Sequence, residues 1–269
     1  MLLSFLLLLP LGAAAQINIS GKVFGGARQA DINGHTFVEI GAEKHDVIIN
    51  AVYGGNDIAG TIGSSTKPSG VDDDGHISDL NIYNVFVRTD KEGENKHLFI
   101  GQLFGGGYGD YTYTPSGDNY STKITYKVAT QVLVPNSDPE EYEWQYVDQE
   151  VTLDDIKKPE IDRTYVDIHG GTFGYVYGGG NNVTVNSKTY ICINNESTPW
   201  ELRGDDDIVN TSDDVISAPE LQAMGINTEY FDQTGAYNFS RVFGGTNKAP
   251  MDIMHTWHLP AGKIENLYS

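Results

Sequence analysis

The sequence predicts an all-β fold, and within that class a parallel β-helix (solenoid) with inserted β-hairpins and one short helix. A phrase of an aliphatic residue, Phe or Tyr, and two glycines recurs five times along the chain. Most other segments are rich in β-branched and aromatic residues and end at Gly, Asn, Asp or Pro, which is typical of short strands between turns. Repetition of one phrase indicates stacked structural units. The glycine pairs that close the five copies are Gly25 and Gly26, Gly54 and Gly55, Gly105 and Gly106, Gly178 and Gly179, and Gly244 and Gly245.

The first 15 residues have the features of a signal peptide. Leu2 to Leu11 is an apolar run, and small residues up to Ala15 precede Gln16, which is the pattern that signal peptidase cleaves. The run is too short to span a bilayer as a helix. We therefore expect residues 1–15 to be removed, and residues 16–269 to be exported without a membrane span.

Charge and cysteine content exclude several classes of protein. The chain has 37 acidic and 17 basic residues, for a formal net charge of −20. Nucleic acid is not an expected partner, because binding it requires clustered Lys and Arg. Cys192 is the single cysteine, so no disulfide can form within the chain. Its alternating surroundings predict a strand residue.

Each copy of the phrase predicts a short strand that runs into a tight corner. The two glycines supply either a positive φ or room for a neighbouring corner to approach closely. Gly262 to Ser269 shares its spacing of glycine, apolar and Tyr positions with Gly171 to Gly178. Since a short strand cannot bury a face alone, we expect the strands to stack as coils of about 20–25 residues around a shared core.

The copies lie at uneven intervals, which predicts excursions from the coils at about 108–162 and 199–235. Alternating apolar residues on both sides of a turn at Pro135 to Pro139 predict a long hairpin laid against the solenoid. A second hairpin is expected from residues 81–89 and 96–104.

The one predicted helix lies in the later excursion. Ser217 is its N-cap, Pro219 lies in its first turn, and Gly225 ends it.

The chain ends at Tyr268 and Ser269, where the other copies continue with glycine. A solenoid requires a polar cap at each end. We therefore expect the sequence to be truncated at the C-terminus, with further repeats of the same protein beyond Ser269.

Two copies, Val176 to Asn181 and Val242 to Asn247, resemble the Val-Tyr-Gly-Gly-Gly-Asn repeats of large exported proteins from Bacteroidales-type gut bacteria. Those proteins are similar to right-handed β-helices and mostly lack an assigned activity. The resemblance covers residues 20–269 in scattered patches. It implies an exported repeat architecture that is secreted or displayed on a bacterial cell surface, and it supplies no catalytic motif.

Two acidic loops are candidate metal sites. Asp72 and Asp74 lie in the first, and Asp205, Asp206 and Asp207 lie in the second. Calcium takes several oxygen ligands from a single loop, so it is the metal ion that these loops would suit. Neither loop matches the EF-hand pattern, and a solvated acidic loop is the alternative. We expect no organic cofactor.

Tyr108, Asp110, Tyr111 and Tyr113 follow the third corner directly and are candidate ligand-binding residues. Exposed tyrosine rings beside a carboxylate suit the stacking and hydrogen bonding of sugars. The alternative is that these rings cover the apolar edge of the solenoid beneath the following hairpin.

No nucleophile elbow, phosphate loop or cysteine cluster occurs in the chain. The sequence therefore favours a non-enzymatic exported protein that displays an extended acidic surface for adhesion or glycan contact. One alternative is a β-helical polysaccharide-active enzyme, a lyase or glycoside hydrolase, which would require a groove where carboxylates converge. The other is a structural spacer of a larger surface protein, which would lack exposed aromatic clusters.

Overall fold

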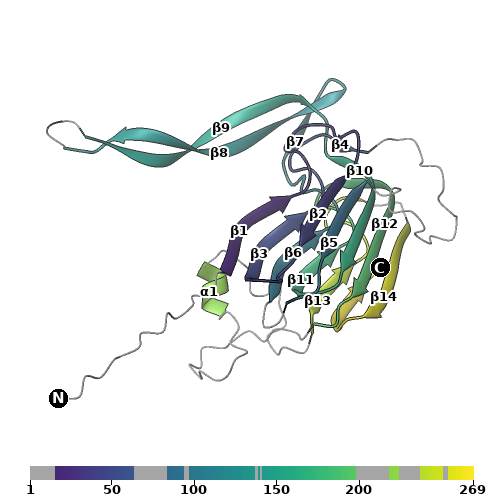
Figure 1. Cartoon of the computed structure of the whole chain (residues 1–269). Coiled ribbons are helices and arrows are strands. Elements are labelled where there is room, and N and C mark those ends of the chain that lie inside the picture. The colour runs from purple at the N-terminus through teal and green to yellow at the C-terminus, as the bar shows by residue number, and fades with distance from the viewer. Residues whose placement is uncertain are drawn as a thin grey trace, which may run out of the picture.

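The computed structural model describes residues 16–63, 84–93, 97–136, 139, 141–197, 218–223, 237–250 and 254–269. Within these residues the chain consists of strands and one short helix, α1 (Ala218–Ala223) (Figure 1). The predicted all-β class and the predicted helix are thus confirmed. Residues 1–15 and the two acidic loops, with Asp72, Asp74 and Asp205 to Asp207, lie outside the described residues.

Two six-stranded sheets form the body of the molecule, and the pairings within them are parallel. Sheet A has the order β1 (Gln16–Phe24), β3 (Asp46–Tyr53), β6 (Leu98–Phe104), β11 (Thr172–Tyr177), β13 (Phe239–Phe243) and β15 (Ile264–Tyr268). Sheet B has the order β2 (Thr36–Ile40), β5 (Val85–Thr89), β10 (Glu160–Ile168), β12 (Thr184–Asn194) and β14 (Met254–Ala261), with β4 (Thr61–Ile62) paired to β10. In both sheets the spatial order of the strands is their order in the chain.

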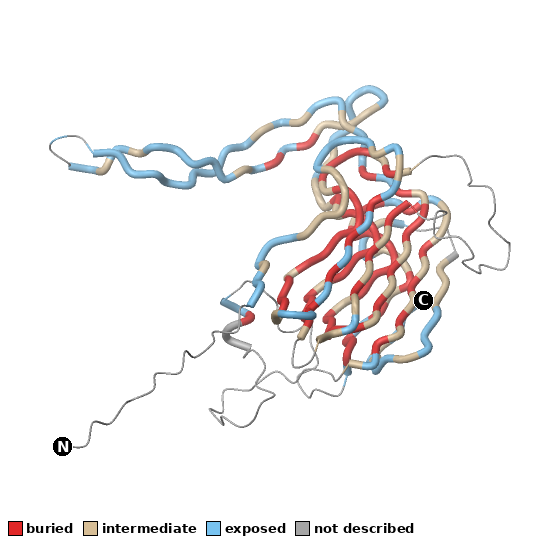
Figure 2. Tube along the Cα trace, in the orientation of Figure 1, coloured by how far each residue is buried: buried red, intermediate tan, exposed pale blue. Residues whose placement is uncertain are grey.

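The core lies between the two sheets. Val52 and Leu103 from sheet A, and Val87, Val166 and Ile191 from sheet B, belong to one apolar cluster and are at most 1% exposed. Figure 2 shows the buried residues concentrated in these strands. Burial of apolar side chains from both sheets in one layer is what holds the sheets together.

The repeated glycines lie where strands of sheet A end, and they form a ladder. The N–H of Gly54 donates to the carbonyl of Phe104 at 3.0 Å, and the N–H of Gly105 donates to that of Tyr177 at 2.9 Å. A Cβ atom on Gly54 would lie 2.6 Å from the carbonyl oxygen of Gly105, and the φ of Gly54 is not positive. Glycine is therefore required at this corner because a neighbouring corner approaches closely.

The aromatic residues of the phrase stack in one column. The ring centroids of Tyr53 and Phe104 are 4.7 Å apart, and those of Phe104 and Tyr177 are 4.6 Å apart. The column continues to Phe24 at one end, and through Phe243 to Tyr268 at the other. Parallel strands in register place equivalent residues one strand spacing apart, about 4.8 Å, so the rings meet face to face. Gly262 to Ser269 is accordingly another copy of the unit.

The predicted long hairpin is present, but its predicted location is wrong. β8 (Asn119–Leu133) pairs antiparallel with β9 (Tyr142–Ile156), and β7 (Tyr113–Ser116) pairs with the start of β8. At the base, Ile124 is 4% exposed and packs with Ile58 and Ala59. Further along, Trp144 is 70% exposed, and the hairpin leaves the body (Figures 1 and 2). A two-stranded ribbon twists strongly, so its apolar face cannot follow a broad sheet.

The second predicted hairpin is wrong. β5 pairs with β2 and β10 in sheet B, whereas β6 pairs with β3 and β11 in sheet A. The segment between β5 and β6 is a crossing from one sheet to the other. Two half-buried strands joined by polar residues show the same sequence pattern whether they form a hairpin in one sheet or belong to two different sheets.

Candidate functional site

The segment from Tyr108 to Tyr113 lies where the body meets the antiparallel hairpin. The Tyr108 ring packs edge-on against Tyr53, with 5.3 Å between centroids, and the Nζ atom of Lys22 lies 3.4 Å from the Tyr108 centroid. The rings of Tyr108, Tyr111, Tyr113 and Tyr120 then follow one another edge to face. These rings connect the aromatic column of sheet A to the beginning of β8, where Tyr120 lies.

Asp110 and the hydroxyls of Tyr111 and Tyr113 have hydrogen-bond partners within the chain. The Tyr111 hydroxyl donates to Oδ1 of Asp57 at 2.8 Å, and the Tyr113 hydroxyl donates to the carbonyl of Ile58 at 2.6 Å. Burial is the main cause that raises the pKa of Tyr111 and of Tyr113. The hydrogen bond to Asp57 and its negative charge raise the pKa of Tyr111 further, and the charge of Asp57 raises that of Tyr113. The Nζ atom of Lys248 donates to Oδ2 of Asp110 at 2.5 Å. The structure thus brings the four predicted residues together and gives Asp110 and the hydroxyls of Tyr111 and Tyr113 internal partners.

A second group of aromatic side chains, the aromatic row, stands on the outer face of sheet B. Its members are register partners on β2, β5, β10 and β12, and successive ring centroids are 6.2, 5.9 and 5.1 Å apart. Neighbouring residues such as Val38 and Val166 point into the core, so the row points outward. Phe37 is 57% exposed, and the other rings are half-buried. The row consists of Phe37, Phe86, Tyr165 and Tyr190.

A polar row runs beside the aromatic row, two residues further along each strand. It consists of Glu39, Arg88, Asp167, Cys192 and His258. The Nε atom of Arg88 lies 3.7 Å from Oδ2 of Asp167, and the Nε2 atom of His169 lies 3.0 Å from Oδ1 of the same carboxylate. Hydrogen-bond donors and acceptors are therefore interleaved along one edge of the aromatic row.

Electrostatics in the polar row do not favour nucleophilic chemistry. Burial, and then the neighbouring Asp167 carboxylate, raise the pKa of the Cys192 thiol to about 11. Burial, followed by Cys192 and Asp167, also raises the pKa of Tyr190. Because the thiolate is the reactive form of cysteine, Cys192 is unreactive at neutral pH.

Sequence reasoning missed the aromatic row, although a signal for it exists. Thr36 to Glu39, Thr164 to Asp167 and Thr189 to Cys192 share the order Thr, aromatic, β-branched, polar. This second phrase lacks the glycines that make the first one conspicuous. Its threonines face inward and donate to corner carbonyls, Thr36 to Gly54 at 2.8 Å and Thr189 to Gly244 at 2.6 Å.

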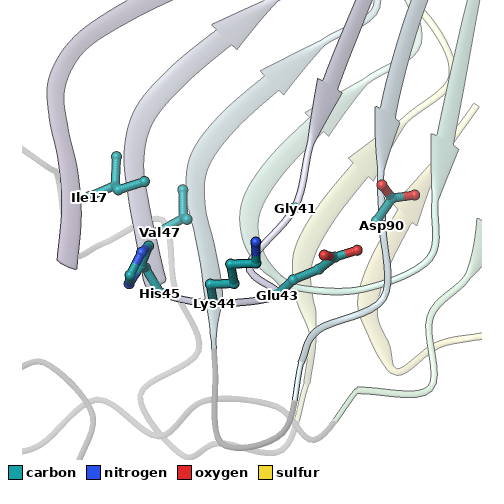
Figure 3. A pocket seen from close by; sticks show the side chains of 7 residues that line it. All are labelled: Ile17, Gly41, Glu43, Lys44, His45, Val47 and Asp90. Atoms are coloured by element: carbon teal, nitrogen blue, oxygen red, sulfur yellow. The ribbon is translucent and has the colours of Figure 1, made fainter. Parts of the chain in front are cut away.

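Two surface hollows contain paired carboxylates. The first, of about 310 Å³, lies beside the turn between β2 and β3, and Figure 3 shows its lining side chains. The second, of about 370 Å³, lies where β4 meets β10 and includes Glu160 and Asp162. The first hollow is lined by Ile17, Gly41, Glu43, Lys44, His45, Val47 and Asp90.

Among the described residues, no group of three or more His, Cys, Asp or Glu is arranged to hold a metal ion. The same part of the chain contains no helix with the length and apolar character needed to cross a membrane. Comparison with protein-family models, curated proteins and solved structures finds no match to this chain.

Proposed function

We propose that this chain is an exported β-solenoid that binds glycans on the outer face of sheet B. The alternation of the chain between two parallel sheets with the same strand order supports the solenoid, since each coil then contributes one strand to each sheet. The signal-peptide pattern and the resemblance to exported repeat proteins support secretion or surface display. The acidic composition supports a solvated exterior.

The observation that carries the proposal is the solvent-facing aromatic row beside the polar row. Sugar rings present C–H groups that pack on aromatic faces, and their hydroxyls require hydrogen-bond donors and acceptors nearby. Phe37 and Phe86 provide apolar faces, whereas Glu39 and Arg88 lie on the same strands within reach of hydroxyl groups. An extended chain of sugars would cross the strands and contact one aromatic side chain per strand.

The charges of this face favour a neutral glycan. The positive charge of Arg88 is shared between Asp90, at 3.6 Å, and Asp167, at 3.7 Å. Glu39 and Asp167 would repel a polyanion, as would the net charge of −20. Neutral polysaccharides are therefore the expected ligand class.

The test is a glycan array probed with the mature chain and with the Phe37→Ala and Tyr165→Ala variants. Each substitution removes one stacking surface, so retention on neutral glycans should weaken roughly tenfold, as expected when about 1.4 kcal/mol of contact is lost. Tyr268→Ala, which changes an aromatic residue that is 42% exposed on β15 of sheet A, is the matched control and should bind normally. An array without retained glycans, or retention unaffected by both sheet B variants, would contradict the proposal.

A repeat of the array with a chelator tests whether glycan binding requires calcium. Loss of retention on chelation would assign part of the site to the acidic loops at Asp72 and Asp74 or at Asp205 to Asp207. Retention that is unchanged would show that binding does not require calcium.

A polysaccharide-active enzyme is the second candidate, and the first hollow favours it. Glu43 and Asp90 line this hollow together with Lys44 and His45 (Figure 3). A pair of carboxylates across a concave site is what glycoside hydrolysis requires. Release of new sugar ends from an array-positive polysaccharide should then be abolished by Glu43→Gln or Asp90→Asn, and preserved by Glu160→Gln from the second hollow. Intact polysaccharide after prolonged incubation with the wild-type chain would eliminate this candidate.

A further inference from the structure

The antiparallel hairpin has an exposed aromatic face. We call residues 123–133 of β8 and 142–152 of β9 the arm. Tyr142, Trp144 and Tyr146 are alternate residues of β9 and are 56%, 70% and 74% exposed. Alternate residues of a strand share one face, so the three rings form a single ridge. Their register partners on β8 include Gln131 and Ala129, which are too small to cover them. Figure 2 shows most of the arm as exposed.

The same strand has an open edge. The order of this sheet is β7, β8, β9, so β9 pairs with β8 and with no other described strand. An edge strand presents N–H and C=O groups that can pair with another chain. Natural edges are commonly protected by charged residues, especially Lys, by Pro or by a bulge. In β9 the register shift lies near Asp155, and the segment from Tyr142 to Val147 contains Glu143 as its one charged residue and no Lys or Pro. A weakly protected length of edge therefore runs beside the exposed aromatic ridge.

We propose that two copies of this chain associate through the outer edges of β9, which pair antiparallel about a two-fold axis at Trp144. In this register Trp144 of one copy lies opposite Trp144 of the second copy, and Tyr142 lies opposite Tyr146. Aromatic residues placed directly opposite on antiparallel strands stabilise a sheet. With a two-fold axis, each copy contributes the same surface to the contact, which is the usual arrangement in homodimers.

Hydrogen bonding favours this register over the one centred on Glu143. On the other face of the strand, Glu143 of one copy lies opposite Gln145 of the second. Within a single chain the Nε2 atom of Gln145 already donates to Oε1 of Glu143 at 2.5 Å, so the same donor and acceptor can be exchanged across the axis. The neighbouring register, centred on Glu143, would place two carboxylates opposite each other, which is destabilising.

The acidic composition does not oppose contact at the ridge. Lys127 pairs with Asp148 at 2.8 Å, and Lys123 pairs with Glu150 at 2.6 Å. The acidic side chains that continue the aromatic face toward the base are therefore neutralised within each copy, and like-charge repulsion between copies is reduced there.

The exposed area suits a reversible dimer. A large aromatic side chain buries roughly 150–250 Å², so the ridge and its strand edge offer a few hundred Å² on each copy. That places the contact toward the lower end of specific interfaces, near or below about 1,200 Å² in total. Association should then depend on protein concentration over an accessible range. A dimer would also carry two sheet B faces, which would strengthen attachment to a multivalent glycan surface.

A second copy fits the ridge better than a glycan or a lipid surface does. The residues beside the ridge are Gln131 and Ala129, which offer fewer groups for sugar hydroxyls than the polar row of sheet B. Glu141 and Glu143 lie at the distal end of β9, where an anionic membrane would be repelled.

Sedimentation velocity of the mature chain over a concentration series tests the association. The wild-type chain should show a reversible monomer–dimer equilibrium. The double variant Trp144→Ala with Tyr146→Ser should raise the dissociation constant roughly tenfold or more, because central aromatic residues dominate interface energies. Phe37→Ala, a change at another exposed aromatic residue, should leave the dissociation constant unchanged. A chain that stays monomeric throughout, or a dimer that the double variant does not weaken, would overturn the proposal.

Disulfide trapping tests the register, with Cys192→Ser as the background in all variants. An equimolar mixture of the Glu143→Cys and Gln145→Cys variants should oxidise to a linked dimer, because these positions face each other across the axis. The Glu143→Cys variant alone should link much less, since its own copies lie at diagonal positions about 7–8 Å apart. Equal linking of the single variant and of the mixture would exclude the register centred on Trp144. Unchanged thermal unfolding of each variant shows that the fold is retained.

Discussion

The hydroxyl of Thr164 donates a hydrogen bond of 2.6 Å to the carbonyl oxygen of Gly178. Thr164 belongs to β10 of sheet B, Gly178 follows β11 of sheet A, and both residues are buried. The bond therefore joins a strand of one sheet to the corner that ends a strand of the other. Thr36 and Thr189 make the equivalent bonds, whereas Val85 occupies the same register position on β5.

Thr164→Val should lower the free energy of unfolding by about 1–3 kcal/mol, since the buried carbonyl of Gly178 loses its hydroxyl donor. Val85 shows that the valine shape is accommodated at this register, so lost hydrogen bonding and not a clash is the expected cause. Thr164→Ser, which keeps the hydroxyl, should be the milder variant in urea denaturation. Equal stability of Thr164→Val and the wild-type chain would show that the bond contributes nothing.

Gly54→Ala should destabilise the body by about 1–3 kcal/mol through overpacking. The new Cβ atom would lie 2.6 Å from the carbonyl oxygen of Gly105 and 2.7 Å from a methyl group of Val87. Gly21→Ala is the matched control, because no atom lies within 4 Å of a Cβ placed there. Its effect should stay within about 0.5 kcal/mol. Similar unfolding midpoints for the two variants would argue against close packing of the corners.

Glu92→Gln should stabilise the chain more at neutral than at acidic pH. The Leu98 N–H donates to Oε1 of Glu92 at 2.9 Å, a bond that glutamine can keep. Burial, reinforced by the negative charge of Asp46, raises the pKa of Glu92 above its ordinary value of 4.5. A carboxyl whose pKa is raised on folding stabilises the folded state fully only below its unfolded pKa. That contribution is lost as the pH rises through the folded pKa.

The measurement for Glu92 is thermal unfolding of both chains at about pH 4 and pH 7, on either side of the ordinary glutamate range. The midpoint of Glu92→Gln relative to the wild-type chain should be higher at pH 7 than at pH 4. If the midpoint of Glu92→Gln minus that of the wild-type chain is constant, or shrinks as the pH rises, the pKa of Glu92 is not raised by folding.

Tyr113→Phe should lower the free energy of unfolding by about 1 kcal/mol, because the hydroxyl bond to the Ile58 carbonyl is removed. Glycan retention should be unchanged if residues 108–113 serve mainly to join the hairpin to the body. Weaker retention by a folded Tyr113→Phe variant would instead support sugar contact at Tyr108, Asp110, Tyr111 and Tyr113.

The sequence by itself determined the repeating unit and its stacking. Parallel strands in register bring equivalent residues together, so recurrence of an aromatic residue before two glycines anticipates the stack of Phe104 on Tyr177. Local patterns were also sufficient for α1 and for the pairing of β8 with β9, since a helix cap and a hairpin turn depend on residues close in the chain.

Only the tertiary structure decided which faces meet solvent and which strands share a sheet. Tyr165 and Tyr177 each adjoin a valine that enters the core, Val166 or Val176, and their surroundings in the sequence are alike. Tyr177 is 5% exposed, between Phe104 and Phe243, whereas Tyr165 is half-buried on the open face of sheet B. The two differ because burial depends on what packs over a face, and those atoms come from residues distant in the chain. For the same reason, alternation within β5 and β6 could not reveal that they belong to different sheets.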